Sequence, residues 1–244
     1  KFDNESKELG NWYVGQKQGE IWGYETYGLF QSEQEIAGAA NQDKVSGGIK
    51  LMPGDIRFVD RNNDGVIDWG DNTVDNPGDK KIIGNSTPRY HYGINLGADW
   101  KGFDLGIFFQ GVGKRDLYLP GTSFRSHYGS EWQVPSAYNN DYWTEENTRA
   151  YFPRARFNGG SAINQAQTRY MVDASYCRLK SVSIGYTLPK VLTQKASIEK
   201  IRIYFTGENL FTISDTPDGL DPELDNPYTY PMQRSLSVGL SLTF

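Results

Sequence analysis

The stretch from Met232 to Phe244 alternates strictly between apolar residues and small or polar ones. The apolar set is Leu236, Val238, Leu240, Leu242 and Phe244, and Ser235, Ser237, Gly239, Ser241 and Thr243 lie between them. Successive side chains of a β-strand point to opposite faces, so this pattern predicts a strand with one apolar face. At about 3.3 Å per residue and a tilt of about 45°, it rises roughly 30 Å, enough to cross an outer membrane. The stretch predicts either the closing strand of a transmembrane β-barrel or an edge strand of a soluble β-sandwich.

The composition is typical of an all-β chain with long polar loops. Of its 244 residues, 27 are Gly and 16 are Tyr, which favours short strands joined by turns. No apolar run approaches the length of about 18 residues that a transmembrane helix needs. The mean hydropathy of -0.62 is typical of soluble proteins, but a membrane barrel also reaches low values because only half of each strand faces lipid.

Residue counts argue against several functions. The net charge is -5 without a basic cluster, which argues against nucleic-acid binding. The single Cys177 excludes a disulfide framework and a Cys-rich zinc site. The histidines, His91 and His127, lack Ser–His–Asp or zinc-ligand spacing, so we expect no enzyme. The chain starts at Lys1 without the signal peptide that a secreted barrel needs, so we expect a piece of a longer polypeptide.

Residues 60–71, DRNNDGVIDWGD, match the calcium-loop pattern in which oxygen ligands alternate along a tight turn. The predicted ligands are Asp60, Asn62 and Asp64, then the Val66 carbonyl, then Asp68 through water, and finally Asp71, where the pattern prefers Glu. Gly65 occupies the sharp turn, where a Cβ would be in the way. A structural calcium ion would stiffen this loop, and an Asx-rich turn without metal is the alternative.

Residues 88–112 predict the clearest hairpin. Tyr90, Tyr92, Ile94, Leu96, Ala98 and Trp100 share one face of its first strand, and Phe103, Leu105, Ile107 and Phe109 continue that face on the second. Lys101 and Gly102 predict a two-residue turn. The opposite face carries Gly, Asn and Asp, as a crowded or water-filled barrel interior would. Aromatic residues at both ends of the apolar band match the interface girdle of membrane barrels.

The connections between the predicted strands alternate in length. We expect residues 1–87 to be mostly an extracellular loop region and residues 88–244 to hold the last strands of a barrel. The predicted strands are 88–100, 103–112, 176–187, 200–211 and 232–244, with outer loops at 113–175 and 212–231. Bacterial outer-membrane barrels combine short periplasmic turns with long extracellular loops, so the alternation favours the barrel. Phe244 would act as its assembly signal.

Two local features lie in the predicted loops. Ser32 predicts the N-cap of a short helix, with Glu35 as its capping-box partner. The long loop carries six aromatic residues, which can stack on sugars or peptides but which we expect to pack the loop on itself. These residues are Trp132, Tyr138, Tyr142, Trp143, Tyr151 and Phe152.

Eight stretches together resemble the carboxyl-terminal part of SusC/RagA-type TonB-linked outer-membrane transporters. They are NWYVGQKQGEIWGYETYGLFQSEQEI (11–36), PGDIRFVDRNNDGVID (53–68), IIGNSTPRYHYGINLGADWKGFDLGIFFQGVG (82–113), YWTEEN (142–147), YCRLKSVSIGYTLP (176–189), IRIYFTGENLFTIS (201–214), GLDPE (219–223) and the final LTF. The resemblance spans nearly the whole chain, and its motifs are specific as an ordered set.

The resemblance implies a bacterial outer-membrane protein, a large antiparallel transmembrane β-barrel of about 22 strands that holds a plug. It also implies uptake of oligosaccharides or peptides, energy from the TonB system, and a SusD-like surface lipoprotein as partner. The further partners would be outer-membrane lipid and the remainder of the barrel and plug. This chain would supply the last five or six strands, which cannot close into a barrel alone. The alternative function is that of a secreted, calcium-stabilised β-sandwich that binds glycans.

Overall fold

The structure, a computed structural model, describes residues 4–118, 141–156, 160–193, 198–217, 220–224 and 229–244. The chain forms two compact units. Unit 1 contains Lys1–Thr87 and Leu117–Val172, and unit 2 contains Pro88–Asp116 and Asp173–Phe244. Within the described ranges, no helix is both long and apolar enough to span a membrane.

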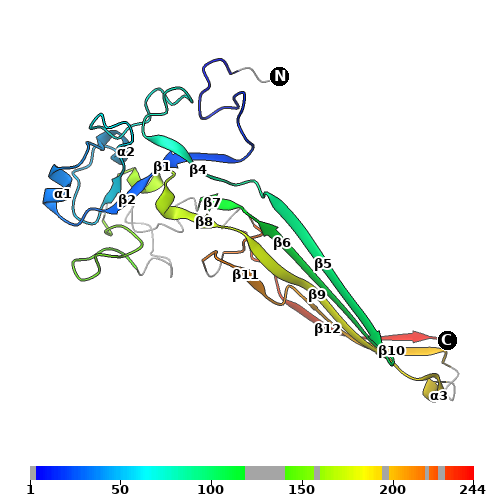
Figure 1. Ribbon diagram of the computed structural model, residues 1–244. Coiled ribbons are helices and arrows are strands. Elements are labelled where there is room, and N and C mark those ends of the chain that lie inside the picture. Colours follow the sequence, from blue (N-terminus) through cyan, green and yellow to red (C-terminus); the bar gives the residue numbers. More distant parts are fainter. Residues whose placement is uncertain (1–3, 119–140, 157–159, 194–197, 218–219, 225–228) are drawn as a thin grey trace. The chain divides into compact units, whose positions relative to one another are not determined.

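Unit 2 is built on one antiparallel sheet with the strand order β12-β10-β9-β6-β5, in which the long strands lie side by side (Figure 1). The strands are β5 (Tyr90–Trp100), β6 (Phe103–Gly113), β9 (Tyr176–Thr187), β10 (Lys200–Glu208) and β12 (Ser235–Thr243), and the short β11 (Thr212–Ser214) also pairs with β9. A short helix, α3 (Lys190–Thr193), follows β9. The predicted fold class, all-β with antiparallel strands of a large barrel, is confirmed.

The ends of two strands differ from the expected ranges. The strand expected at 200–211 stops at Glu208, because Asn209 takes a left-handed conformation with φ of 50° and turns the chain. The strand expected from residue 232 begins at Ser235. The two-residue turn between β5 and β6 is confirmed, since Lys101 and Gly102 both have positive φ, 47° and 91°, as its tightest form requires.

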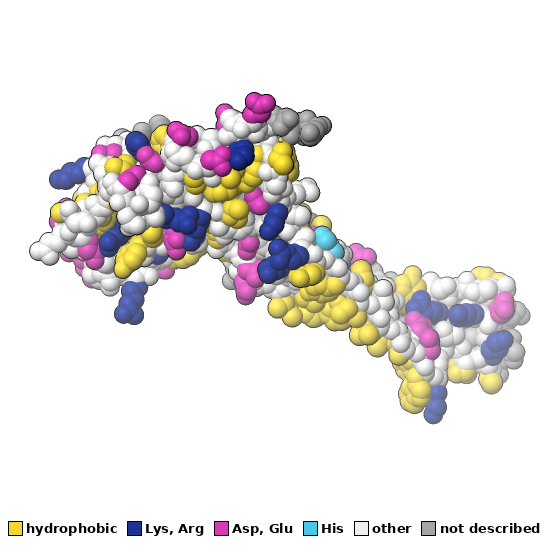
Figure 2. All heavy atoms as spheres, turned by 45° about the horizontal axis from the view of Figure 1, so that its top comes forward, with side chains coloured by type: hydrophobic (Ala, Val, Ile, Leu, Met, Phe, Trp, Pro, Cys, Tyr) yellow, Lys and Arg dark blue, Asp and Glu magenta, His cyan; other side chains and the backbone are white. Residues whose placement is uncertain are grey.

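The strand register gathers the apolar residues of unit 2 on one face. Neighbouring strands place residues in cross-strand rows whose side chains share a face. Three such rows are Trp100–Phe103–Tyr186–Ile203–Leu240, Ala98–Leu105–Ile184–Phe205–Val238 and Leu96–Ile107–Val182–Gly207–Leu236. Many of these side chains are exposed, and Figure 2 shows hydrophobic side chains gathered along the long strands. We call this surface the apolar face.

Unit 1 consists of short elements joined by irregular segments. Its small sheets pair β1 (Glu20–Tyr24) with β4 (Lys80–Asn85) and β2 (Thr26–Leu29) with β3 (Ile56–Phe58). Its helices are α1 (Glu33–Ala37), α2 (Asp43–Ser46), η2 (Ala162–Asn164) and η3 (Thr168–Tyr170). A further pair, β7 (Asp116–Tyr118) and β8 (Met171–Asp173), includes the positions where the chain passes from one unit to the other.

The core of unit 1 joins two segments that the sequence analysis treated as separate loops. Tyr24, Phe30, Ile56, Ile67 and Tyr170 are at most 1% exposed, and they come from both segments. Residues 4–87 therefore contain folded elements that contribute to this core, and their expected extracellular location stays a prediction. Periodicity did not predict it, because β1 and β4 pair across almost sixty residues and contain a register shift.

The two local expectations in this unit can be compared with the structure. The N-cap is confirmed, because the Ser32 hydroxyl accepts the Glu35 N–H at 3.2 Å. The Glu35 carboxylate accepts the N–H of Gln31, one residue before the expected partner. Phe152 packs on Tyr151 and Tyr170 of the same loop, as expected, whereas Trp143 donates to Gln31 at 3.4 Å and packs against the first segment. Trp132 and Tyr138 lie outside the described residues.

Candidate functional site

The face of the unit 2 sheet opposite the apolar face carries small and polar residues, and we call it the polar face. One of its rows is Gly97–Gly106–Ser183–Thr206–Ser237, and the next is Asp99–Asp104–Gly185–Tyr204–Gly239. In a membrane barrel one face of each strand meets lipid and the other faces the interior. The polar face therefore corresponds to the face that lines the interior of such a barrel.

An ion pair crosses the polar face near the turn between β5 and β6. Arg202 donates from Nε to the Asp104 carboxylate at 2.9 Å, and its Nη2 donates to the other oxygen of the same carboxylate. The pair passes directly over Gly185, where an added Cβ would lie 2.5 Å from Asp104 and 2.6 Å from Arg202. Glycine at this position thus lets a charged bridge join two strands that are separated by a third.

The other end of the polar face carries a buried charge cluster around Arg178 of β9. All three guanidinium nitrogens of Arg178 donate: Nε to the Thr212 hydroxyl at 2.8 Å, Nη1 to Glu223 at 2.7 Å, and Nη2 to Asp221. The Arg178 side chain is only 4% exposed and that of Asp221 is 5% exposed. Charges this deeply buried require partners, and here each has at least one.

Two more basic side chains hold the same loop. Arg115 donates to the Pro222 carbonyl at 3.0 Å, and Lys180 donates to Glu223 at 2.8 Å. Three consecutive loop residues are therefore each bound by the sheet or its end. We call this set, Arg115, Arg178 and Lys180 with Asp221, Pro222 and Glu223, the loop anchor.

Asp221 also ties the returning part of its own loop. Its carboxylate accepts the backbone N–H of Glu223 at 3.0 Å and that of Met232 at 3.0 Å. Burial alone raises the pKa of Asp221, but the Arg178 guanidinium and these two N–H groups outweigh it, and the pKa lies below its ordinary value. Asp221 therefore remains a carboxylate at neutral pH and links the sheet to both sides of the loop.

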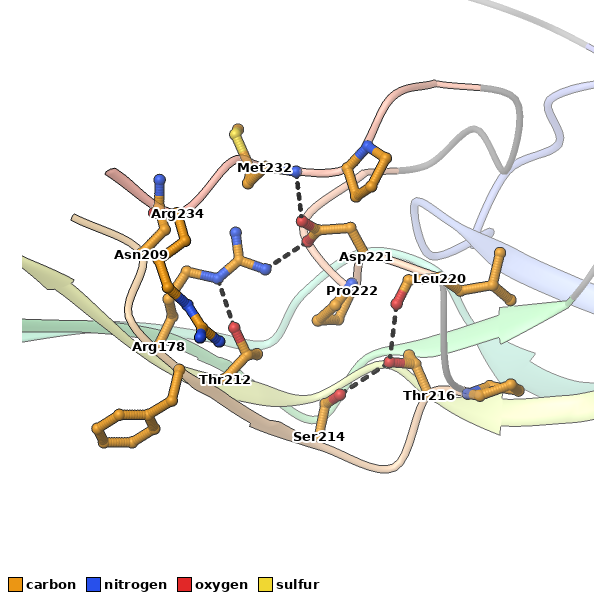
Figure 3. Close-up of a pocket in the computed structure, with 13 residues that line it drawn as sticks. Arg178, Asn209, Thr212, Ser214, Thr216, Leu220, Asp221, Pro222, Met232 and Arg234 are labelled. Atoms are coloured by element: carbon orange, nitrogen blue, oxygen red, sulfur yellow. Dashed lines mark hydrogen bonds and ion pairs between the residues drawn. The ribbon is translucent and has the colours of Figure 1, made fainter. Parts of the chain in front are cut away.

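A pocket of about 440 Å³ opens beside the loop anchor (Figure 3). The strand residues Arg178 and Thr212 form one side, and Asp221, Met232 and Arg234 approach from the loop. Pockets of this size hold small ligands or single residues of larger ones. Every residue that lines it belongs to unit 2.

The predicted calcium loop is a tightly bonded turn in unit 1. Asp60 accepts the N–H groups of Asn63 and Gly65 at 2.7 and 2.8 Å. Asn62 and Asp64 bond to each other through a side-chain contact of 2.8 Å. Gly65 has a φ of 84°, in agreement with the glycine requirement. The first three predicted ligands therefore lie on one short turn.

The last two predicted side-chain ligands have other partners. Asp68 pairs with Lys44 at 2.7 Å, and this cation lowers the pKa of Asp68 most strongly. Asp71 accepts from the Asn76 amide at 2.8 Å. Among the described residues, no group of three or more His, Cys, Asp or Glu side chains is placed to hold a metal ion. The expected calcium ligands also include the Asn62 amide and the Val66 carbonyl, which such a group of acidic, His and Cys side chains does not count. Calcium binding therefore stays a prediction.

Asp79 lies outside the calcium-loop motif but binds the backbone of this loop. Its fully buried carboxylate accepts the N–H of Arg61 at 2.7 Å and that of Asp68 at 2.9 Å. Burial raises its pKa, while these bonds act in the opposite direction. The turn is thus fixed to the core of unit 1 by an acidic residue from outside the twelve-residue pattern.

Sequence reasoning missed the loop anchor, the pocket and Asp79. The residues GLDPE drew attention only as part of a family resemblance, and nothing local joins Asp221 to Arg178, 43 positions away. Phe244 follows β12 and is 83% exposed, and its role in assembly stays a prediction.

Comparison with known proteins identifies the family, although no protein-family model matches the chain. The chain is 31% identical over 248 residues to TonB-dependent receptor P3 of Formosa agariphila, an alignment that covers 94% of this chain and 22% of that receptor. It is 29% identical over 194 residues to TonB-dependent receptor SusC of Bacteroides thetaiotaomicron, covering 77% of this chain and 17% of SusC.

Solved structures show the same fold. The RagAB peptide transporter matches with a TM-score of 0.63 at 21% identity, over 96% of this chain and 24% of the transporter chain. The RagAB peptide importer in its 'open-open' state matches with a TM-score of 0.66 at 20% identity, over 96% of this chain and 23% of that one. The chain spans less than a quarter of the length of each of these four relatives. By its sequence and its fold, the chain belongs to the TonB-dependent receptors of the SusC and RagA type.

Proposed function

We propose that this chain is part of the barrel wall of an outer-membrane importer for oligosaccharides or peptides, which draws energy from the TonB system. The observation that carries the proposal is the continuous apolar face across five antiparallel strands, opposite a polar face of small residues. Lipid requires the first surface and a solute path requires the second. The relatives are named receptors and transporters, which favours transport over catalysis.

We also propose a SusD-like surface lipoprotein as the partner and the extracellular side as the location of unit 1. The chain enters β5, leaves β6 and enters β9 at the strand ends opposite the β5–β6 turn, and in such barrels the long extracellular loops join the strand ends opposite the short turns. Because the chain is a small part of its relatives, import itself is a property of the longer protein. The plug, the remaining strands and the TonB contact would come from the rest of that protein.

The test is to extract outer membranes in mild detergent and identify the intact species that carries these peptides. The expected species is several times larger than 27.6 kDa, has a lipoprotein bound, and supports solute uptake that is lost when TonB is deleted. A free, folded species of 27.6 kDa in the soluble fraction would overturn the proposal and favour the secreted glycan-binding module.

A calcium ion in the 60–71 loop is a second proposal. Asp60, Asn62 and Asp64 fit such an ion, since their oxygens are already gathered on one turn. Asp68 and Asp71 would have to exchange Lys44 and Asn76 for the ion or for its bound water. The ion would supply rigidity to this loop.

A further inference from the structure

We infer that the pocket beside the loop anchor binds a carboxylate group of the solute that the full-length protein imports, with Arg234 as the group that recognises it. The inference rests on the proposed import function and adds the chemistry of the solute.

The pocket wall offers donors but few acceptors. Both Asp221 oxygens are already used, by Arg178 and by the N–H groups of Glu223 and Met232. The hydroxyls of Ser214 and Thr216 bond to each other at 2.8 Å, and Thr216 reaches the Leu220 carbonyl. Asn209 Oδ1 lacks a partner among the described residues but is itself buried, so the accessible part of the wall favours a ligand that accepts hydrogen bonds.

The donors that remain are strong. The Arg234 side chain makes no hydrogen bond or ion pair with any residue that the structure describes, and Arg offers five N–H groups in a planar fork. Thr212 accepts from Arg178, so its own hydroxyl hydrogen can still be donated. A guanidinium with a neighbouring hydroxyl matches a carboxylate, which accepts two parallel hydrogen bonds from arginine.

The net charge of the pocket wall also favours a carboxylate ligand. Arg178 and Arg234 line the pocket with only Asp221 as a negative side chain, so the lining carries one net positive charge in a chain whose net charge is -5. Arg178 is neutralised by the loop anchor, which leaves Arg234 as the cation available to a ligand.

The pocket is also correctly placed and held open. Arg178 and Thr212 pair with each other in register, and Arg178 pairs with Gln110, which places the pocket on the polar face. Asp221 binds both Arg178 and the Met232 backbone, so the strand side and the loop side of the pocket are tied together before any ligand arrives. Such a preformed site loses less entropy on binding.

A carboxylate can come from a peptide or from an acidic sugar, so the test uses both. The full-length protein, purified in detergent with its partner chains, is titrated calorimetrically with triglutamate and with trigalacturonate. Triglutamine and trigalactose are the neutral analogues. We expect at least one acidic probe to bind more tightly than its neutral analogue, and Arg234→Gln to weaken that binding about tenfold or more.

Two variants control the experiment. Arg89→Gln removes another exposed arginine of unit 2 outside the pocket and should leave both affinities unchanged. Arg234→Lys keeps the charge but loses the planar fork, and should bind with intermediate affinity. A loss for triglutamate alone supports a peptide carboxylate, a loss for trigalacturonate alone supports an acidic glycan, and a loss for both supports recognition of the carboxylate itself.

The inference is overturned if Arg234→Gln binds both acidic probes as Arg89→Gln does, or if neither acidic probe binds more tightly than its neutral analogue. Uptake separates this failure from a failure of the proposed function. If TonB-dependent uptake is present and Arg234→Gln changes no affinity, only the carboxylate site is wrong. If the wild-type protein shows no such uptake, the import function itself is wrong.

Discussion

Arg178 and Asp221 form an ion pair in which both side chains are about 95% buried, although they lie 43 positions apart in the sequence. Together with the Arg115–Pro222 and Lys180–Glu223 contacts, the pair fastens the loop to the sheet. Because Arg178 also binds Glu223 and Thr212, removal of one arginine would break three contacts at once.

The first prediction concerns this arginine. Arg178→Met should destabilise the loop by about 3–5 kcal/mol, because it leaves the buried Asp221 carboxylate without its cation. Limited proteolysis of the full-length protein in detergent should then show cleavage within residues 212–231. Arg234→Gln, which changes an exposed arginine of the same region, is the matched control and should stay resistant. Equal resistance of both variants would show that the anchor does not hold the loop.

The second prediction concerns pH. The pKa of Asp221 is lowered in the folded protein, so the unfolded state binds more protons in acid. Its stabilising contribution is complete above the ordinary carboxyl pKa of about 4 and is lost as the pH falls through the lower folded value. The protection of the loop amides from hydrogen exchange, relative to their intrinsic rates at each pH, should stay constant from neutral pH to about pH 5 and fall only below about pH 4.

The matching variant is Asp221→Asn, which removes the titrating group. Its loop amides should be less protected than those of the wild type at neutral pH and should lack the further loss of protection in acid that this carboxylate causes. A loss of protection of the wild-type loop between pH 7 and pH 5 would contradict the assigned pKa direction, because Asp221 would then have to bind a proton above its ordinary pKa.

The third prediction compares neighbouring residues on opposite faces of β9. Ile184 belongs to the apolar face and Ser183 to the polar face. Arginine at a lipid-facing position near the bilayer centre costs about 2–4 kcal/mol. Ile184→Arg should therefore lower the amount of folded full-length protein in the outer membrane, measured by heat-modifiable gel mobility, whereas Ser183→Arg should not. Similar levels for the two variants would argue that the apolar face does not meet lipid.

The long strands could be predicted because their information is local. Alternation over β5, β6, β9 and β12 reveals which face is apolar, and a Lys-Gly turn sets the hairpin register. The pairing of β9 with β6 contains one irregularity, and the spacing of apolar residues in β9 reflects it. Leu179 and Val182 are three positions apart yet pair with Phe109 and Ile107, and the register shift between them moves Arg178 onto the polar face.

The rest could not be predicted because it depends on contacts between distant segments. Unit 1 has strands of three to six residues, too short for a clear period, and its core joins residues far apart in the chain. Asp79 and the loop anchor follow the same rule. The sequence does not distinguish a buried aspartate or glutamate from an exposed one. Only the fold shows which N–H groups or cations surround its carboxylate.

The fourth prediction tests calcium in the 60–71 loop. With calcium present, residues 53–84 of the full-length protein should resist proteolysis, and a chelator should expose them, because the ion would join oxygens that otherwise repel one another. The double variant Asp60→Ala and Asp64→Ala should be sensitive under both conditions. Asp75→Ala is the matched control, since Asp75 is an exposed carboxylate of the same segment that pairs with Lys7. If the chelator leaves the wild-type cleavage pattern unchanged, then the hydrogen bonds of Asp60 and the buried Asp79 hold this turn without a metal ion.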